Sequence, residues 1–213
     1  MSATTRLILW RHGVTDWNEQ GIFQGRADIP LNERGLAQAA AVAPLLAAMR
    51  PDVLYVSPLS RARQTAQAFV DLTGAAMHID DRLTEIDVGS WVGISLAKVA
   101  ALDPAAGADM AAGRDYRRSP TGETMTEVGR RVGECLRELA DNHDGETVLV
   151  VSHGGAIRTG IANLLELPYA VSIKFGGMVN CAWSGVARRS GIWRLEAYNH
   201  TPPAFDPKVR LEI

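Results

Sequence analysis

The sequence predicts an α/β protein, a three-layer α/β/α sandwich around a central, mostly parallel sheet. Three short and continuous apolar runs, at residues 7–10, 53–56 and 148–151, are typical of parallel strands covered on both faces. Helical patterns separate these runs, and such alternation indicates helices packed on both sides of one sheet. The 213 residues contain no Ser-, Pro- or Gly-rich and no charge-rich linker, so a single domain over 1–213 is expected.

Caps and apolar periodicity predict the helices that follow these strands. Asn32 is a candidate N-cap of the first helix, and Pro44 is expected to kink that helix. Ser60 is expected to cap the second helix. Thr124 and Glu127 have the spacing of a capping box and introduce a further amphipathic helix.

The elements still to be placed are one helix, two strands and two irregular segments. A helix is expected over 155–167, and strands over 179–187 and 192–198. The Ala- and Gly-rich segment 105–119 is expected to be an irregular or loosely helical excursion, with Arg114, Arg117 and Arg118 forming a solvated face. The tail 201–213 contains three prolines and is expected to be flexible.

Bulk composition excludes several classes of function. The formal net charge of −2 gives no electrostatic reason to expect nucleic acid or an anionic membrane as a partner. No apolar segment is long enough to cross a bilayer, and the start of the chain has no secretory cleavage pattern, so a cytoplasmic location is expected. Cys135 and Cys181 have no metal or redox spacing and are expected to be inert core thiols. No pair of histidines has helical ligand spacing, so no metal is expected.

Two of the predicted strands end in a histidine followed by glycine. The first strand ends in RHG at 11–13, and the strand at 148–151 ends in SHGG at 152–155. Ligands of open α/β sheets bind beyond the carboxyl ends of the strands. His12 and His153 are therefore expected to share one pocket, where one histidine attacks the bound ligand and the other holds it.

A histidine that attacks phosphorus needs cations around the phosphoryl oxygens, and arginine suits this role best. Arg11 directly precedes His12. Arg61 lies in the first turn of the helix after strand 53–56, where a bound anion would offset its unfavourable interaction with the helix dipole. The departing oxygen also needs a proton. Glu85, close to apolar residues that favour a neutral carboxyl, is the candidate general acid and then general base.

Five blocks in order resemble the histidine phosphatase superfamily, the group that contains the cofactor-dependent phosphoglycerate mutases. They are RHGVTDWN at 11–18, QGRADIPL at 24–31, SPLSRA at 57–62, Glu85, and SHGG at 152–155. The resemblance implies that His12 is the phosphorylated nucleophile and Glu85 the proton donor, and that neither a metal nor another cofactor takes part. The residues that it places on the phosphate or the substrate are Arg11, Arg61, His153, Asn18, Gln24 and Gly154.

The resemblance favours a phosphatase of a small phosphate ester and leaves two alternatives open. Mutases of this superfamily carry a longer, proline-rich insertion that the interval 91–121 lacks, yet a phosphoglycerate mutase stays an alternative. A non-catalytic module that binds phosphate esters is the second. Segments 176–183 and 193–199 resemble the actinobacterial glucosyl-3-phosphoglycerate phosphatase branch, which implies a sugar or glycerate phosphate as substrate. The Trp-Val-Gly at 91–93 departs from the Trp-Glu-Gly that is usual in the superfamily, and this departure removes a carboxylate near the pocket. A homodimer is expected because homodimers are common in the superfamily.

Overall fold

A single six-stranded sheet forms the centre of the computed structural model, which describes residues 4–202. The strand order is β3-β2-β4-β1-β5-β6; β1 to β4 run parallel, whereas β5 and β6 are antiparallel to their neighbours. This arrangement confirms the predicted α/β fold with a mostly parallel sheet. The strands are β1 (Thr4–Arg11), β2 (Val53–Val56), β3 (Met77–Ile79), β4 (Thr147–Ser152), β5 (Trp183–Arg189) and β6 (Ile192–His200).

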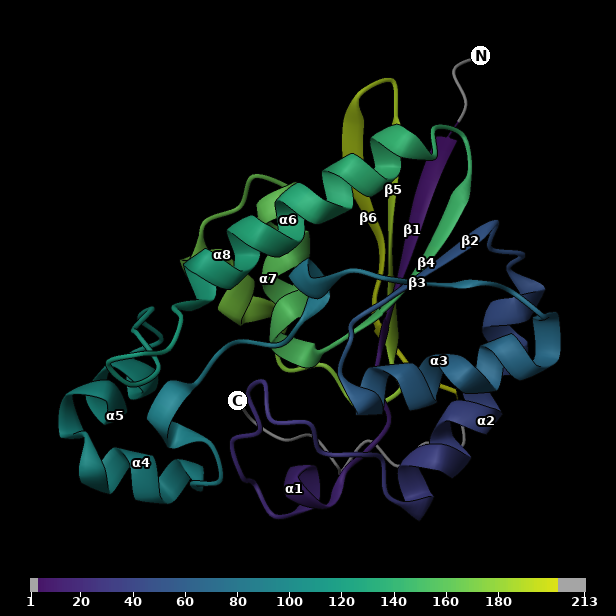
Figure 1. The fold of residues 1–213 in the computed structure, drawn as a ribbon. Helices are drawn as coiled ribbons and strands as arrows, with labels where there is room; N and C mark the ends of the chain where they lie inside the picture. The colour runs from purple at the N-terminus through teal and green to yellow at the C-terminus, as the bar shows by residue number, and fades with distance from the viewer. Residues whose placement is uncertain (1–3, 203–213) are drawn as a thin grey trace.

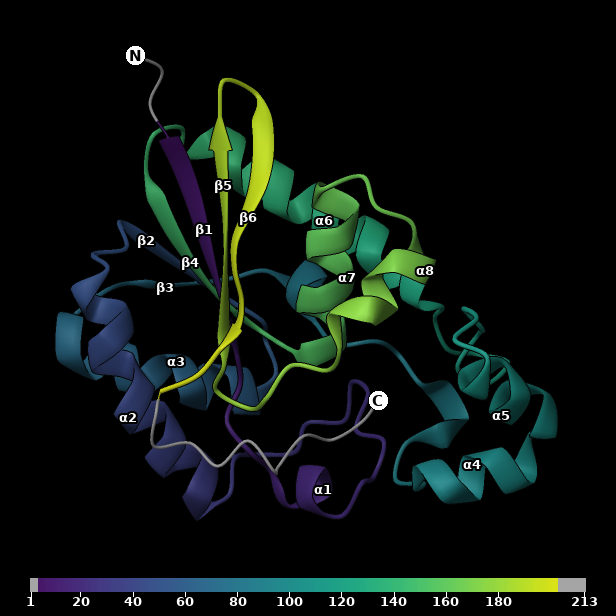
Figure 2. The same cartoon turned by 180° about the vertical axis from the view of Figure 1, so that it is seen from behind.

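Helices cover both faces of this sheet (Figure 1 and, from behind, Figure 2). Helices α2 (Glu33–Ala48) and α3 (Ser60–Thr73) pack on one face, and α6 (Met125–Asn142) and α7 (Gly154–Leu164) pack on the other. Successive residues of a strand point to opposite faces, so Leu7 and Leu9 of β1 join the core under α6 and α7. Ile8 and Trp10 join the core under α2 and α3. Both faces of the central strands are therefore covered by helices and shielded from water, which explains the continuous apolar runs in their sequences.

Two of the three predicted caps are present, and one is wrong. The Asn32 side chain accepts from Gly35 N at 2.9 Å, and α2 continues through Pro44. Thr124 and Glu127 form the reciprocal capping box at the start of α6, a contribution of about 1 kcal/mol. Ser60 is not the N-cap of α3, because Leu59 occupies that position. The Ser60 hydroxyl instead donates to Asp28 Oδ2 at 2.7 Å.

The second half of the chain differs from its prediction at element boundaries. Helix α7 begins at Gly154 and ends at Leu164, and β5 begins at Trp183 instead of residue 179. The segment 105–119 is in part a regular helix, α5 (Pro104–Ala111), which follows α4 (Leu96–Leu102) and leads into a loop. Both helices lie at one end of the molecule, away from the sheet (Figure 1). Of the tail 201–213, all but residues 201 and 202 lie outside the described residues.

The shorter elements all lie in the connections between these strands and helices. They are α1 (Asp16–Glu19), α8 (Tyr169–Ser172), and the 3₁₀ turns η1 (Asp81–Leu83), η2 (Gly89–Trp91) and η3 (Ile173–Phe175). Within residues 4–202, no helix combines the length and the apolarity that a bilayer crossing requires. Cys135 and Cys181 are buried and unpaired, as predicted, and burial raises the pKa of the Cys135 thiol to about 12.

The two His-Gly motifs meet at the point where the chain changes sides of the sheet. Strands β1 and β4 are neighbours, and their last residues, Arg11 and Ser152, are paired in register. The chain after β1 leads to α2 on one face, whereas the chain after β4 leads to α7 on the other. Such a switch point opens a crevice at the carboxyl ends of the strands, where α/β proteins bind their ligands.

Candidate active site

His12 follows β1 directly and is held in one orientation by its own backbone. The residue is 3% exposed, and its ring Nδ1 lies 2.6 Å from the carbonyl oxygen of Gly13. A carbonyl oxygen can only accept, so Nδ1 carries the proton and Nε2 keeps its lone pair. The residue also lines a cavity. The sequence thus places an unprotonated imidazole nitrogen at the predicted position.

The two strand-ending histidines are neighbours, and both are kept neutral by their surroundings. The ring centroids of His12 and His153 are 5.1 Å apart. Burial, and after it the positive charges of Arg61 and Arg11, hold the pKa of His12 well below its ordinary value. Burial and Arg61 act in the same direction on the pKa of His153. Each imidazole therefore enters a reaction at neutral pH without its second proton.

His153 contacts Arg61 rather than the cavity. Its Nδ1 accepts from Arg61 Nε at 3.2 Å, and its Nε2 donates to Ser57 Oγ at 2.7 Å. Both ring nitrogens are thus engaged, and His153 is not among the residues that line the cavity. In this arrangement it orients Arg61. A direct hydrogen bond from His153 to phosphate stays a prediction.

Arg61 and Arg11 bring two buried guanidinium groups to the cavity. Arg61 donates to Ala27 O at 2.7 Å and to Gly25 O at 2.8 Å, which leaves two of its five N–H groups free for a ligand. Arg11 donates from Nη1 to Met178 O, and its Nε has no partner. Burial lowers the pKa of Arg61 to about 10, so it stays charged at neutral pH. Neither arginine forms an ion pair with a described carboxylate, and uncompensated buried cations favour binding of an anion.

Glu85 lines the same cavity and contacts the N-terminus of α7. Its Oε2 accepts from Gly155 N and its Oε1 from Ala156 N, each at 3.0 Å. A Cβ at position 155 would lie 2.7 Å from Glu85 Oε1, so a glycine is needed for this contact. The surroundings of the carboxyl are therefore polar on this side, in contrast to the apolar setting that the sequence predicts.

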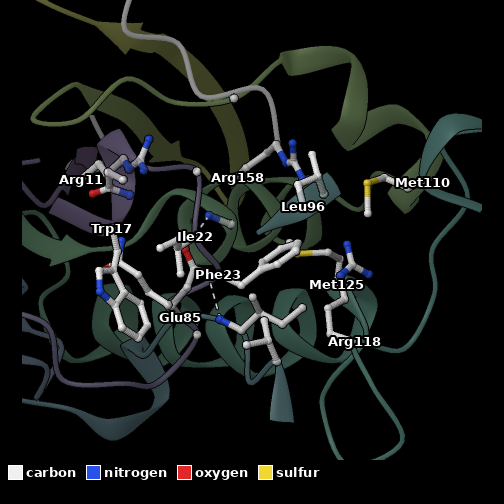
Figure 3. Close-up of a pocket in the computed structure, with 18 of the residues that line it drawn as sticks. Arg11, Trp17, Ile22, Phe23, Glu85, Leu96, Met110, Arg118, Met125 and Arg158 are labelled. Carbon is white, nitrogen blue, oxygen red and sulfur yellow. Dashed lines mark hydrogen bonds between the residues drawn. The ribbon is translucent and has the colours of Figure 1, made fainter. Parts of the chain in front are cut away.

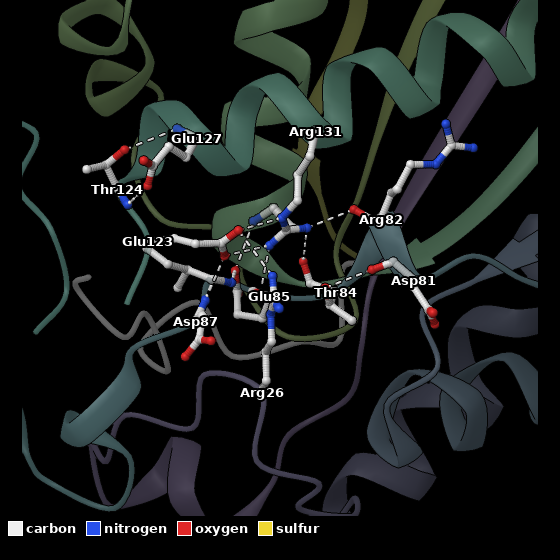
Figure 4. Close-up of polar contacts among 12 residues, drawn as sticks. Arg26, Asp81, Arg82, Thr84, Glu85, Asp87, Glu123, Thr124, Glu127 and Arg131 are labelled. Carbon is white, nitrogen blue, oxygen red and sulfur yellow. Dashed lines mark hydrogen bonds and ion pairs between the residues drawn. The ribbon is translucent and has the colours of Figure 1, made fainter. Parts of the chain in front are cut away.

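A network behind Glu85 fixes the loop that carries it (Figure 4). Arg131 of α6 donates to the carbonyl oxygens of Arg82 and Thr84 at 2.8 Å and of Glu85 at 2.9 Å. The same guanidinium pairs with Glu123 through two contacts of 2.9 and 3.0 Å. Arg131 thus determines where the backbone of Glu85 lies.

The three remaining predicted residues differ in how they meet the cavity. Asn18 Oδ1 accepts from Thr15 N and from Asn180 Nδ2, both at 3.1 Å, and the residue lines the cavity. Gln24 lines it too, and its buried Oε1 has no partner. Gly154 does not line it. A Cβ there would lie 3.2 Å from Arg11 Nε, so Gly154 makes room for that guanidinium.

The cavity itself has a volume of about 510 Å³, and Figure 3 shows Arg11, Glu85 and Arg158 around it. Glu85 is the one carboxylate among its described lining residues. The remaining wall is largely apolar. It includes Trp17, Ile22, Phe23, Leu96, Met110 and Ile173.

Two cavity or support residues were not singled out by the sequence, and a third, Arg118, was placed wrongly. Arg158 is a buried lining residue and the one charged residue of α7. Asn180 donates to His12 O and Gly13 O, both at 3.2 Å. Arg118, expected on a solvated face, is instead buried against Asp115 and lines the cavity. A single charge in a helix without other charged residues is the one sequence signal that could have indicated Arg158.

Comparison with known proteins gives the class to which this fold and site belong. A family model described as the histidine phosphatase superfamily (branch 1) matches residues 7–201, and the chain belongs to this superfamily. A glucosyl-3-phosphoglycerate phosphatase of Mycobacterium tuberculosis is 36% identical over 212 residues, which are 91% of this chain and 94% of the relative. A probable phosphoglycerate mutase of Yersinia pestis is 32% identical over 188 residues, with 88% and 87% covered. The solved structure of a mycobacterial glucosyl-3-phosphoglycerate phosphatase with VO3 superposes with a TM-score of 0.85 at 35% identity, covering 92% of this chain and 99% of that one.

Proposed function

We propose that the chain is a phosphomonoesterase that transfers the phosphoryl group of a small metabolite to His12 and then to water. One observation carries the proposal. The Nε2 atom of a neutral His12 is available beside a cavity that two buried arginines without carboxylate partners line. Membership in the histidine phosphatase superfamily supports the same reaction.

In the first step, the Nε2 lone pair forms a bond to phosphorus and the ester P–O bond breaks. The electron pair of that bond stays on the departing oxygen, which takes a proton from the Glu85 carboxyl. The phosphorylated imidazole keeps its Nδ1 proton, and the Gly13 carbonyl stabilises the resulting positive charge. Arg11 and Arg61 neutralise the phosphoryl oxygens, with Asn18 as a further donor.

In the second step, water attacks phosphorus while the Glu85 carboxylate takes its proton. The N–P bond breaks and its electron pair returns to Nε2, so the enzyme is regenerated and inorganic phosphate is released. The backbone N–H groups of Gly155 and Ala156 hold the carboxylate in place between the two steps.

For the substrate, we infer a phosphorylated glycerate or sugar, with glucosyl-3-phosphoglycerate as the first candidate. A cavity of about 510 Å³ is in the range of small-metabolite sites. The name of the Mycobacterium tuberculosis relative supports this choice. Gln24, whose Oε1 is without a partner, is available for a substrate hydroxyl. A cytoplasmic location and a homodimer stay predictions.

The experiment is phosphate release by the wild type, H12A and the control H78A across several esters. The panel contains glucosyl-3-phosphoglycerate, mannosyl-3-phosphoglycerate, 3-phosphoglycerate, sugar phosphates and p-nitrophenyl phosphate. We expect H12A to lose turnover on every ester, whereas H78A, changed at an exposed histidine, keeps it. Full activity of H12A would end the proposal, and a flat profile would end the glycosyl-phosphoglycerate assignment.

The same assay separates the two alternatives. A phosphoglycerate mutase, which the name of the Yersinia pestis relative suggests, would need a bisphosphoglycerate primer and would release little phosphate. A non-catalytic binding module would bind the esters tightly without forming phosphohistidine.

A further inference from the structure

Arg158 is a buried cation for which the proposed reaction has no use. Its side chain lines the cavity, the residue is 5% exposed, and its Nε has no hydrogen-bond partner. Among residues 4–202, no carboxylate lies within ion-pair distance of it. Burying a cation without a counter-charge costs several kcal/mol, and binding of an anionic ligand offsets this cost.

Arg158 lies one helical turn beyond the glycine that packs against Arg11. It lies four residues beyond Gly154 on α7, or about 6 Å along the helix axis. Residues four apart share one helix face, and helical side chains lean toward the N-terminus of their helix. Gly154 lies against the Arg11 guanidinium, so Arg158 presents its side chain to the cavity next to Arg11, where it can meet a second group of the same ligand.

Arg118, the fourth arginine in the cavity wall, makes the contrast clear. Its guanidinium pairs with Asp115 at 3.2 Å and lies 3.9 Å from the centre of the Tyr116 ring. Its charge is thus already balanced within the protein. Arg11 and Arg61 are accounted for by the phosphoryl group, which leaves Arg158 as the cation without a role.

We propose that Arg158 binds a carboxylate that the substrate carries in addition to its phosphate. The planar fork of one guanidinium matches one carboxylate through two parallel hydrogen bonds. A phosphoryl group in this same protein is met by two arginines, which argues against a second phosphate at a single one. The substrate class is then a phosphorylated hydroxy acid. This inference rests on the phosphatase function proposed above.

The test compares two substrates that differ only in this group, 3-phosphoglycerate and glycerol 3-phosphate, in which a hydroxymethyl group replaces the carboxylate. Loss of one charge-assisted contact predicts that R158M lowers kcat/KM for 3-phosphoglycerate by about 30-fold. For glycerol 3-phosphate, we expect a change of less than about threefold by the same reasoning. R158K, which keeps the charge but lacks the fork, should lie between the wild type and R158M. The control is R130M, at an exposed arginine of α6.

Two outcomes would overturn the assignment. Either the wild type shows no preference for 3-phosphoglycerate, or R158M lowers kcat/KM for both substrates equally. If R158M does not fold, R158Q, which retains a hydrogen-bonding side chain, allows the same comparison of kcat/KM for the two substrates. H12A separates this failure from failure of the phosphatase proposal, because turnover in H12A contradicts the nucleophile whatever the substrate ratio.

Discussion

The arginines on the two sides of Glu85 differ in what they contact. On the cavity side, Arg11, Arg61 and Arg158 are buried and have no carboxylate partner among the described residues. Behind Glu85, Arg131 pairs with Glu123 and caps three carbonyl oxygens. The fold thus balances the charge of Arg131 but not the charges of the three arginines on the cavity side.

This difference separates arginines that bind a ligand from an arginine that positions other residues of the site. A cation buried without an anion destabilises the ligand-free protein, so its presence indicates binding. A cation with a complete set of partners stabilises the fold, and its loss acts on the reaction only through what it positions. Replacing arginines of the two groups should therefore affect different measurements.

R61M tests the cavity side and has the largest expected effect. Removal of a preorganised donor to the transferring phosphoryl group should lower kcat/KM by about 10³-fold. The free energy of unfolding should change by no more than about 2 kcal/mol, because lost hydrogen bonds are offset by removal of a buried charge. Steady-state kinetics and urea unfolding measure the two quantities. A fall in stability with activity within tenfold of the wild type would place Arg61 in the structural group.

R131M tests the network behind Glu85. Loss of the Glu123 pair and of three carbonyl contacts should lower the free energy of unfolding by about 2 kcal/mol. We expect kcat to fall by about 30-fold with KM little changed, because Glu85 moves while the phosphate-binding groups stay. R131K should keep part of the stability and part of kcat. The control R130M, on the same helix, should change neither quantity. A higher KM at constant kcat would show that Arg131 acts on binding instead.

The pH dependence of stability tests the electrostatic part of the comparison and has the smallest expected effect. His12 and His153 have pKa values in the folded state well below those of the unfolded chain, chiefly through burial. The unfolded state therefore binds protons first, and stability is lost as pH falls below about 6.5. Each histidine contributes about 1.4 kcal/mol per pH unit across this window. H12Q and H153Q should each have a shallower acid slope in urea titrations, and a slope equal to that of the wild type would contradict neutral burial.

The sequence predicted the central strands and the meeting of the two histidines because these follow from local patterns. Continuous apolar runs define strands covered on both faces, and the switch point brings His12 and His153 to ring centroids 5.1 Å apart. Where α5 lies, the sequence predicted only an irregular or loosely helical segment, because the Ala- and Gly-rich composition has little periodicity. Asp103 and Pro104 nonetheless supply a cap signal, and the Asp103 side chain accepts from Ala106 N at 3.0 Å.

Other features depend on contacts that no local pattern contains. Arg158 was missed because one charged position does not distinguish an amphipathic helix from α7, which is buried on nearly every side. His153 was expected to touch the phosphate, yet its partners Ser57 and Arg61 come from the segment after β2. Ser60 was predicted as a cap from its residue type alone, whereas its hydroxyl donates to Asp28, which is far away in sequence.

The central claim is that the phosphoryl group of the substrate passes through His12. Rapid alkaline quenching of the enzyme during turnover, followed by peptide mass spectrometry, tests this claim directly. We expect one phosphoryl group on the peptide that contains His12, none in H12A, and a longer-lived adduct in E85Q, in which no base activates water. Phosphate release without any label on His12, or a label on His153 in its place, would contradict the account.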